Sequence, residues 1–167
     1  MNRRVGIVLA TLVIAGIFTA VEGTYSQPTP QATRKVIDLP GKTVQAPFSD
    51  AILSGNTLYL AGRIGLDPKT GKAPDKIEDE IKLLLDGEKD VLGQAGMTMD
   101  DLSYVQVFCT DLSLFEKFNP IYKTYFTKDY PARAFIGAGS LLAGGHFELQ
   151  AIAVKHQYLV GVNDGKP

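Results

Sequence analysis

The chain has 167 residues, of which 45% are hydrophobic and 21% are charged, a balance typical of one compact domain with a real core rather than of a disordered chain. The formal net charge of −1 leaves no excess of cations to hold a phosphate backbone, so no nucleic acid is expected as the main partner. The single cysteine excludes an internal disulfide and a cysteine-rich zinc site, and we expect neither a metal nor a cofactor.

The N-terminal residues 1–23 have the pattern of a secretory signal peptide. Arg3 and Arg4 precede an uncharged apolar run from Val5 to Val21, with small residues near its end. The run is somewhat short for the roughly 20 residues that a membrane-spanning helix needs. We therefore expect cleavage and a periplasmic or secreted protein without stable membrane association; an uncleaved anchor is the alternative.

Three segments follow the signal peptide. Residues 24–34 contain prolines, threonines and glutamines without an apolar period, which indicates a flexible linker. The folded domain should span 35–158, and 159–167 should form a C-terminal tail.

The first predicted elements are two strands and a long helix. "AILSGNTLYLAGRIG" places two apolar strands around Gly55 and Asn56, which both tolerate positive φ and so predict a hairpin. Apolar residues then recur at three- and four-residue steps over 77–95, which marks one face of a helix that Gly96 ends. These apolar residues are Ile77, Ile81, Leu84, Leu85, Val91, Leu92 and Ala95.

The next predicted strand is "LSYVQVFCT". Its alternation places Val105, Val107 and Cys109 on one face, so Cys109 should be a small buried hydrophobic residue rather than a nucleophile.

A second helix should follow in two parts. Ser113 and Glu116 have the spacing of a capping box, but Pro120 lacks the N–H that should bond back to Glu116. We therefore expect a short first turn and then a helix that restarts with Asn119 as its cap and Pro120 in its first position.

Two strands, "ARAFIGA" and "HFELQAIAV", close the domain. In the second, alternation assigns Phe147, Leu149, Ala151 and Ala153 to one face and His146, Glu148 and Gln150 to the other. The order of elements predicts an α+β sandwich in which one mixed sheet carries two helices on a single face.

Two charged residues stand in these last strands. Arg133 opens an apolar run in "YPARAFIGAGS", and Glu148 lies among apolar neighbours, where a carboxylate is costly unless it is paired. The simplest interpretation is a structural ion pair between Arg133 and Glu148 on the sheet surface, and the alternative is that Arg133 binds an anion. His146 could be combined with Ser140 or Asp101 as a triad, but no sequence context supports that geometry.

Read together, five stretches resemble the Rid family, the reactive intermediate deaminases also called YjgF-like proteins. They are "APFSDAILSGNTLYLAGRIGLDPKTGK", "DDLSYVQVFCTDL", "FEKFNPIYKTYF", "YPARAF" and "HFELQAIAV", which run in order over roughly 46–155. The resemblance implies a chorismate-mutase-like fold with a mixed six-stranded sheet and two helices on one face. It also implies a homotrimer with a barrel-like core and sites in the clefts between subunits.

The resemblance also implies a site for a small carboxylate substrate. Arg133 matches the arginine that grips the carboxylate of a 2-imino or 2-enamino acid, and Glu148 matches the acidic residue that orients the attacking water. These two would be the catalytic residues, and no metal or cofactor is implied. The substrate-binding residues would be Arg133, Phe48, Gly62, Asn119 and Phe135.

Several positions depart from the family pattern. Phe48 replaces a common tyrosine, Ala61 replaces a serine, Arg63 replaces a glutamine, and Phe135 replaces a small residue or cysteine. Two hydroxyl groups are therefore missing, and the pocket should be narrower or more apolar than in deaminating members.

Two functions remain open at this point. The first is an exported deaminase that hydrolyses imines such as 2-iminopropionate to a 2-keto acid and ammonia. The second is a non-catalytic trimer that binds small carboxylate metabolites or acts as a chaperone-like scaffold. A ribonuclease role, described for some relatives, is disfavoured by the slight negative charge and the absence of a basic, aromatic patch.

Overall fold

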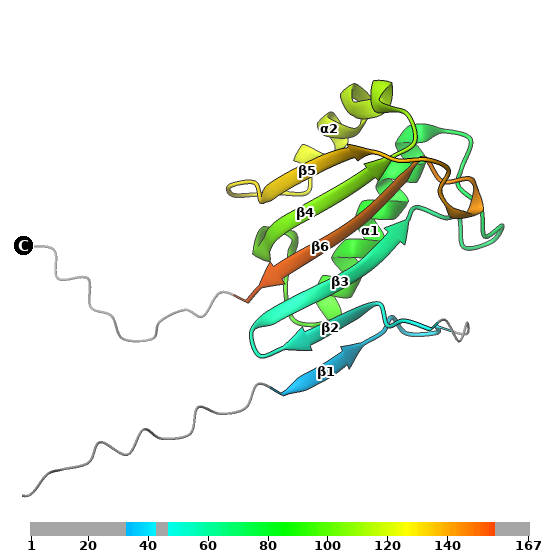
Figure 1. Cartoon of the computed structure of the whole chain (residues 1–167). Helices are drawn as coiled ribbons and strands as arrows, with labels where there is room; N and C mark the ends of the chain where they lie inside the picture. The colour runs from blue at the N-terminus through cyan, green and yellow to red at the C-terminus, as the bar shows by residue number, and fades with distance from the viewer. Residues whose placement is uncertain (1–32, 43–46, 156–167) are drawn as a thin grey trace, which may run out of the picture. The chain divides into compact units, whose positions relative to one another are not determined.

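The structure, a computed structural model, describes residues 33–42 and 47–155. The predicted signal peptide and C-terminal tail, and the linker up to residue 32, lie outside the described residues. Within the described ranges no helix is long and apolar enough to cross a membrane. The main elements are β1 (Arg34–Ile37), β2 (Ala51–Ser54), β3 (Thr57–Ile64), α1 (Ile77–Gln94), β4 (Leu102–Cys109), α2 (Phe115–Lys123), β5 (Ala132–Gly137) and β6 (Phe147–Val154), as Figure 1 shows.

The six strands form one mixed sheet, as the resemblance implied, and their order is β1-β2-β3-β6-β4-β5. Only β4 and β5 pair in parallel, and every other neighbouring pair is antiparallel. The predicted hairpin joins β2 and β3, with Gly55 alone at a positive φ of 59°. No sequence pattern indicated β1, because its first three residues are exposed.

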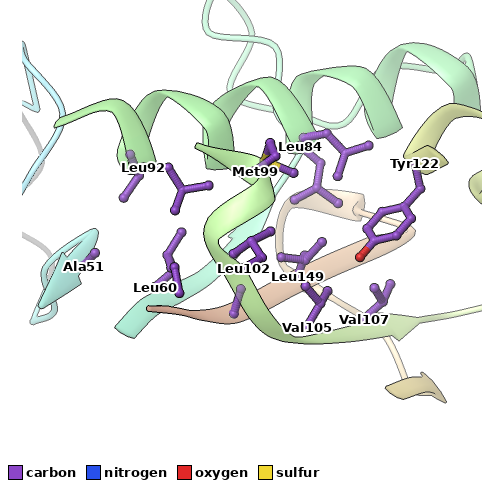
Figure 2. Close-up of a cluster of buried hydrophobic side chains, with 14 of the residues drawn as sticks. Ala51, Leu60, Leu84, Leu92, Met99, Leu102, Val105, Val107, Tyr122 and Leu149 are labelled. Atoms are coloured by element: carbon purple, nitrogen blue, oxygen red, sulfur yellow. The ribbon is translucent and has the colours of Figure 1, made fainter. Parts of the chain in front are cut away.

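Both helices pack on the same face of the sheet, which we call the covered face. Leu149 of β6 and Val105 and Val107 of β4 point from the sheet into the core, where they meet Leu84 of α1 and Tyr122 of α2 (Figure 2). The alternation predicted for β6 is confirmed: the residues on the covered face are buried, and the next residues along the strand are more exposed. Cys109 is buried, as expected.

Helix α1 buries more than its apolar stripe. The predicted apolar face lies against the sheet, but Glu80 and Glu88 on the same face are also buried, at 0% and 1% exposure. The helix ends as expected, because Gly96 adopts a φ of +68° and the Met97 amide donates back to the Leu92 carbonyl at 2.9 Å.

The prediction for the start of α2 was wrong. The helix is continuous from Phe115 to Lys123, Pro120 lies inside it, and Asn119 is not its cap. Both Pro120 and Glu116 are exposed, so solvent can satisfy the Glu116 carbonyl that loses its intrahelical donor. The expected Ser113–Glu116 capping box is also absent; the Asp111 carboxylate instead accepts a hydrogen bond from the Ser113 amide at 2.9 Å.

A β-bulge interrupts β3 beside β6. Leu60 pairs with Ala151 and Arg63 pairs with Leu149, so three steps along β3 match two along β6. The extra residue falls within Ala61–Gly62. Bulges commonly occur next to functional sites, where they change the direction of side chains.

Candidate functional site

Arg133 lies in β5, the edge strand, with its side chain on the covered face. Its pairing with Val105 fixes this orientation, because directly paired residues share a face. The guanidinium Nη2 donates a hydrogen bond to Asn119 Oδ1 of α2 at 2.7 Å. Its Nη1 is buried and has no hydrogen-bond partner in the described part of the chain.

Aromatic rings surround this guanidinium. Its Cζ atom lies 4.6 Å from the centroid of the Tyr122 ring, 5.7 Å from that of Phe135 and 5.8 Å from that of Phe115. Such contacts attract a cation to the faces of the rings and hold it in a fixed place. Arginine is costly to bury, so the cage and Asn119 together explain how a guanidinium can sit at the start of an apolar strand.

A cavity of about 290 Å³ opens beside Arg133. Its lining residues come from α2 and from the turn before β5, and they are Asn119, Tyr122, Lys123, Tyr130, Pro131 and Arg133. The lining contains two cations and no carboxylate. Burial raises the pKa of Tyr122 to about 12 despite the nearby Arg133 charge, so its phenol stays protonated. The cavity is therefore electrostatically suited to an anion.

Glu148 lies in β6 on the opposite side of the sheet, which we call the open face. Val107 pairs with both Phe135 and Leu149, so these three residues share the covered face. Glu148 precedes Leu149 and therefore points the other way. It is half-buried, and it makes no ion pair or side-chain hydrogen bond within the described ranges.

Gly62 provides the space for the Glu148 side chain. A Cβ atom at position 62 would overlap the Oε1 atom of Glu148 and would lie 3.1 Å from its Cδ. The bulge therefore presents a glycine where the carboxylate lies, and any larger residue would push the carboxylate away.

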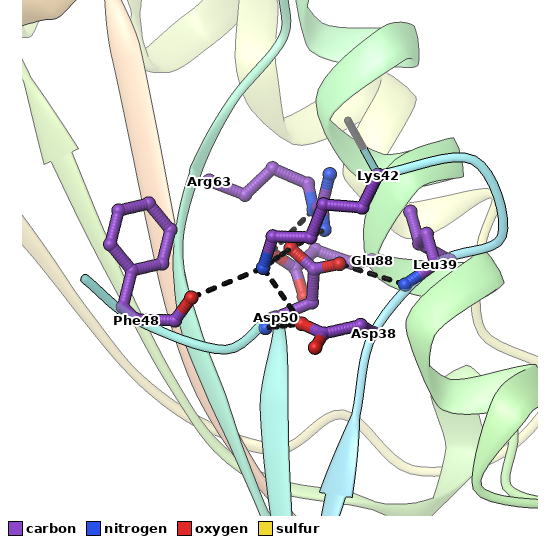
Figure 3. Close-up of polar contacts among 7 residues, drawn as sticks. All are labelled: Asp38, Leu39, Lys42, Phe48, Asp50, Arg63 and Glu88. Atoms are coloured by element: carbon purple, nitrogen blue, oxygen red, sulfur yellow. Dashed lines mark hydrogen bonds and ion pairs between the residues drawn. The ribbon is translucent and has the colours of Figure 1, made fainter. Parts of the chain in front are cut away.

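The remaining predicted pocket residues divide between two places. Phe135 belongs to the Arg133 cluster, since its ring packs edge-on against those of Phe115 and Phe118 at 5.0 and 5.5 Å. Phe48 precedes β2, is 58% exposed, and accepts a hydrogen bond from Lys42 Nζ through its carbonyl at 3.2 Å (Figure 3).

The expected ion pair between Arg133 and Glu148 does not form. The two side chains leave opposite faces of the sheet, so within one chain they cannot share a pocket. The chain instead contains two separate groups of predicted site residues. The Arg133 half consists of Arg133, Asn119 and Phe135 on the covered face, and the Glu148 half consists of Glu148 and Gly62 on the open face.

A buried carboxylate, which no local sequence pattern indicated, supports the start of β6. Glu80 Oε1 accepts hydrogen bonds from the amides of His146 and Phe147 at 2.6 and 3.0 Å, and Oε2 lies 2.8 Å from His146 Nδ1. His146 is therefore tied to Glu80, not to Ser140 or Asp101. Its backbone contact fixes the strand two residues before Glu148.

Comparisons with known proteins agree with this architecture. A family model described as Endoribonuclease L-PSP matches residues 41–155. A RutC family protein from Pyrococcus horikoshii is 37% identical over 110 residues, which cover 65% of this chain and 87% of the relative. A 2-iminobutanoate/2-iminopropanoate deaminase from Rattus norvegicus is 36% identical over 128 residues, which cover 73% of this chain and 90% of the relative.

Solved structures show the same fold. The YjgF gene product from E. coli superposes with a TM-score of 0.68 at 28% identity, over 73% of this chain and 99% of that one. E. coli TdcF with bound serine superposes with a TM-score of 0.67 at 30% identity, over 73% and 99% of the two chains. The chain therefore belongs to the Endoribonuclease L-PSP family, which is the Rid/YjgF family that its motifs resemble.

Proposed function

We propose that this protein is a Rid-type deaminase that hydrolyses small 2-imino and 2-enamino acids, such as 2-iminopropionate, to 2-keto acids and ammonia. Relatives at 34–36% identity carry the name 2-iminobutanoate/2-iminopropanoate deaminase. That name alone does not transfer an activity, so the proposal rests on the site.

One observation carries the proposal: the Arg133 guanidinium is oriented by its own chain but only half satisfied. Asn119 and the aromatic rings fix it, while the buried Nη1 has no partner in the described residues and a cavity opens beside it. A guanidinium has donors in a planar fork that matches a carboxylate. A substrate carboxylate is therefore the ligand that this arrangement favours.

Glu148 is the candidate group for positioning water. It is a carboxylate without a partner among residues 33–42 and 47–155, and it lies over the Gly62 bulge on the open face. Because Arg133 lies on the other face, we propose that the complete site forms between two copies of the chain in a homotrimer. One copy would supply the Arg133 half and the next would supply the Glu148 half.

The reaction needs no redox step. A 2-enamino acid first tautomerises to the imine by proton transfer from solvent. Water then adds to the imine carbon, and one of its protons passes by way of Glu148 to the nitrogen to give a carbinolamine. The proton of the carbinolamine hydroxyl is next transferred to the amino group, and the C–N bond breaks to release ammonia and the 2-keto acid. The protein's task is to hold the carboxylate and the water in reacting distance. The hydroxyls missing at Phe48 and Ala61 are not required by this scheme.

The test is ammonia release from 2-iminopropionate, generated in place by an amino-acid oxidase. The chain should accelerate release, and Arg133→Ala and Glu148→Gln should each remove most of the acceleration. Arg34→Ala and Glu116→Gln, which change exposed residues of β1 and α2, are the matched controls. Saturable binding of 2-keto acids without any turnover would favour the non-catalytic binding module instead.

We also propose that the protein is exported, on the basis of the charged, apolar and small-residue pattern of residues 1–23. Expression in a bacterial host, cell fractionation and N-terminal sequencing would test this. A cytosolic chain that keeps Met1 would contradict it.

A further inference from the structure

The Arg63 side chain extends from β3 to α1 and lies against Gly87 of that helix. Its pairing with Leu149 places its side chain on the covered face, and a Cβ atom on Gly87 would lie 2.7 Å from its Cδ. Glycine inside a helix is destabilising relative to alanine, so its presence needs a local reason. Because Gly87 has no side chain, the Arg63 side chain has room to lie against the helix at this position.

Arg63 ends between two carboxylates from different elements (Figure 3). Its Nη2 lies 3.6 Å from Asp50 Oδ1, at the start of β2, and its Nε lies 3.7 Å from Glu88 Oε1 of α1. Both oxygens of the buried Glu88 lack hydrogen-bond partners within the described residues. The guanidinium is therefore the main polar contact of this carboxyl group.

The same cluster reaches the Glu148 half of the site. The Asp50 carbonyl accepts a hydrogen bond from the Ala61 amide at 2.9 Å, and Ala61 and Gly62 contain the bulge beneath Glu148. Lys42 lies 3.4 Å from Asp50 Oδ1 and also donates to the Phe48 carbonyl. The bulge and the segment before β2 are thus both connected to α1 through Asp50 and Arg63.

We propose that Arg63 is a positioning residue for the Glu148 half of the site. By lying across Gly87 between Asp50 and Glu88, it fixes the bulge at Ala61–Gly62 and thereby the place of the Glu148 carboxylate. The inference rests on the proposed deaminase function, because its consequence is measured in turnover. It assigns no substrate contact to Arg63, whose side chain is on the opposite face from Glu148.

Two glycines of the same helix provide the test. Gly87→Ala in the full chain puts a methyl group where Arg63 lies, without changing any charge. Gly93→Ala adds the same methyl group to α1 at an exposed position with no atom within 4 Å. Both variants gain helix propensity, so a loss of function in Gly87→Ala alone cannot come from a weaker helix.

We expect Gly87→Ala to lower kcat roughly 10-fold or more, since a displacement of about 1 Å at a reacting group can cost that much. The inhibition constant of a 2-keto acid should change less than about twofold, because Arg133 lies on the other face. Gly93→Ala should leave both values unchanged. Arg63→Met, which removes the guanidinium but keeps a long unbranched side chain, should reproduce the loss of kcat.

Amide hydrogen exchange supplies a readout that does not depend on activity. Gly87→Ala should speed exchange at the Ala61 amide, whereas Gly93→Ala should not. If the wild-type chain turns over and Gly87→Ala and Arg63→Met are as active as Gly93→Ala, the inference alone is overturned. A wild-type chain without turnover would overturn the proposed function and the catalytic role of Arg63 together, and unchanged exchange at Ala61 would overturn the structural role.

Discussion

The two halves of the candidate site are built in opposite ways. The Arg133 half is assembled by one chain: a partly buried cation, a 2.7 Å hydrogen bond to Asn119 and a cage of aromatic rings fix it beside a cavity. The Glu148 half is a carboxylate on the open face that lies against the backbone at Gly62. The proposed binding group is therefore preorganised, while the group proposed to position water is half-buried and has no polar partner in the described part of the chain.

The support beneath the Glu148 half shows a second contrast, between two buried carboxylates of α1. Glu80 is hydrogen-bonded to two amides and lies beside the His146 ring, whereas the polar contact of Glu88 within the described ranges is the more distant Arg63. A satisfied buried carboxylate fixes the elements that it joins, and an unsatisfied one is costly in the same environment. Changes at these four residues, Arg133, Glu148, Glu80 and Glu88, should therefore have distinct signatures.

The largest effect should come from Glu148→Gln. Loss of a group that positions and deprotonates water typically lowers kcat by about 10² to 10⁴-fold, while the Kd of a 2-keto acid should stay unchanged. Steady-state kinetics and isothermal titration would separate the two. If Glu148→Gln weakened binding as much as turnover, Glu148 would belong to the binding half, and the division of roles between the two halves would be contradicted.

Arg133→Ala should act on binding instead. Removing a charged partner from an enclosed anion site costs about 2–5 kcal/mol of binding free energy, so the affinity for 2-keto acids should fall roughly 30-fold or more. Arg133→Lys keeps the charge but loses the fork and should recover only part of the affinity. Retention of full affinity by Arg133→Ala in titration calorimetry would contradict this account of the cavity.

Glu80→Ala should lower stability more than any change on the exposed side of α1. It leaves the part-buried amide of His146 and the buried amide of Phe147 without their acceptor, at a cost of about 2–4 kcal/mol in the free energy of unfolding. Urea denaturation would measure this. Asp79→Ala, at an exposed position one residue earlier, is the control, and equal midpoints for the two variants would contradict the supporting role of Glu80.

The smallest effect is a pH dependence that belongs to Glu88. Burial raises its pKa from 4.5 to about 8, against the attraction of Arg63 and with a further rise from Asp50. The folded chain therefore binds more protons than the unfolded chain between these values, and the free energy of unfolding falls as pH rises through that window.

Glu88→Gln should remove this fall. The Tm of the wild type should fall relative to that of the variant as the pH rises from 5 to 8, and the difference should then level off. Lys42, Asp50 and Arg63, the charged groups of the surrounding cluster, remain in both proteins. Parallel Tm profiles across that range would show that the Glu88 carboxyl is not held in its neutral form.

The sequence predicted the helices and strands better than it predicted their arrangement in space. Local periodicity found α1 and the buried face of β6, because each depends on residues a few positions apart. That Arg133 and Glu148 face opposite ways depends on the pairing of β5, β4 and β6, which no local pattern contains. Glu80 and Glu88 were missed for a related reason, since their partners come from loops and strands distant in sequence. The predicted helix restart at Pro120 was wrong because a helix tolerates proline where solvent can reach the carbonyl that loses its donor, here that of Glu116.

Complementation between subunits tests the central claim, that Arg133 and Glu148 from different copies complete one deaminase site. Arg133→Ala and Glu148→Gln chains, each with little activity at a substrate concentration well below the wild-type KM, would be unfolded and refolded together in equal amounts, and ammonia release from 2-iminopropionate would be measured at that concentration. In a cyclic trimer, random mixing restores both groups in about one quarter of the sites. We therefore expect about a quarter of wild-type activity. A mixture no more active than the two variants measured separately would contradict a shared site.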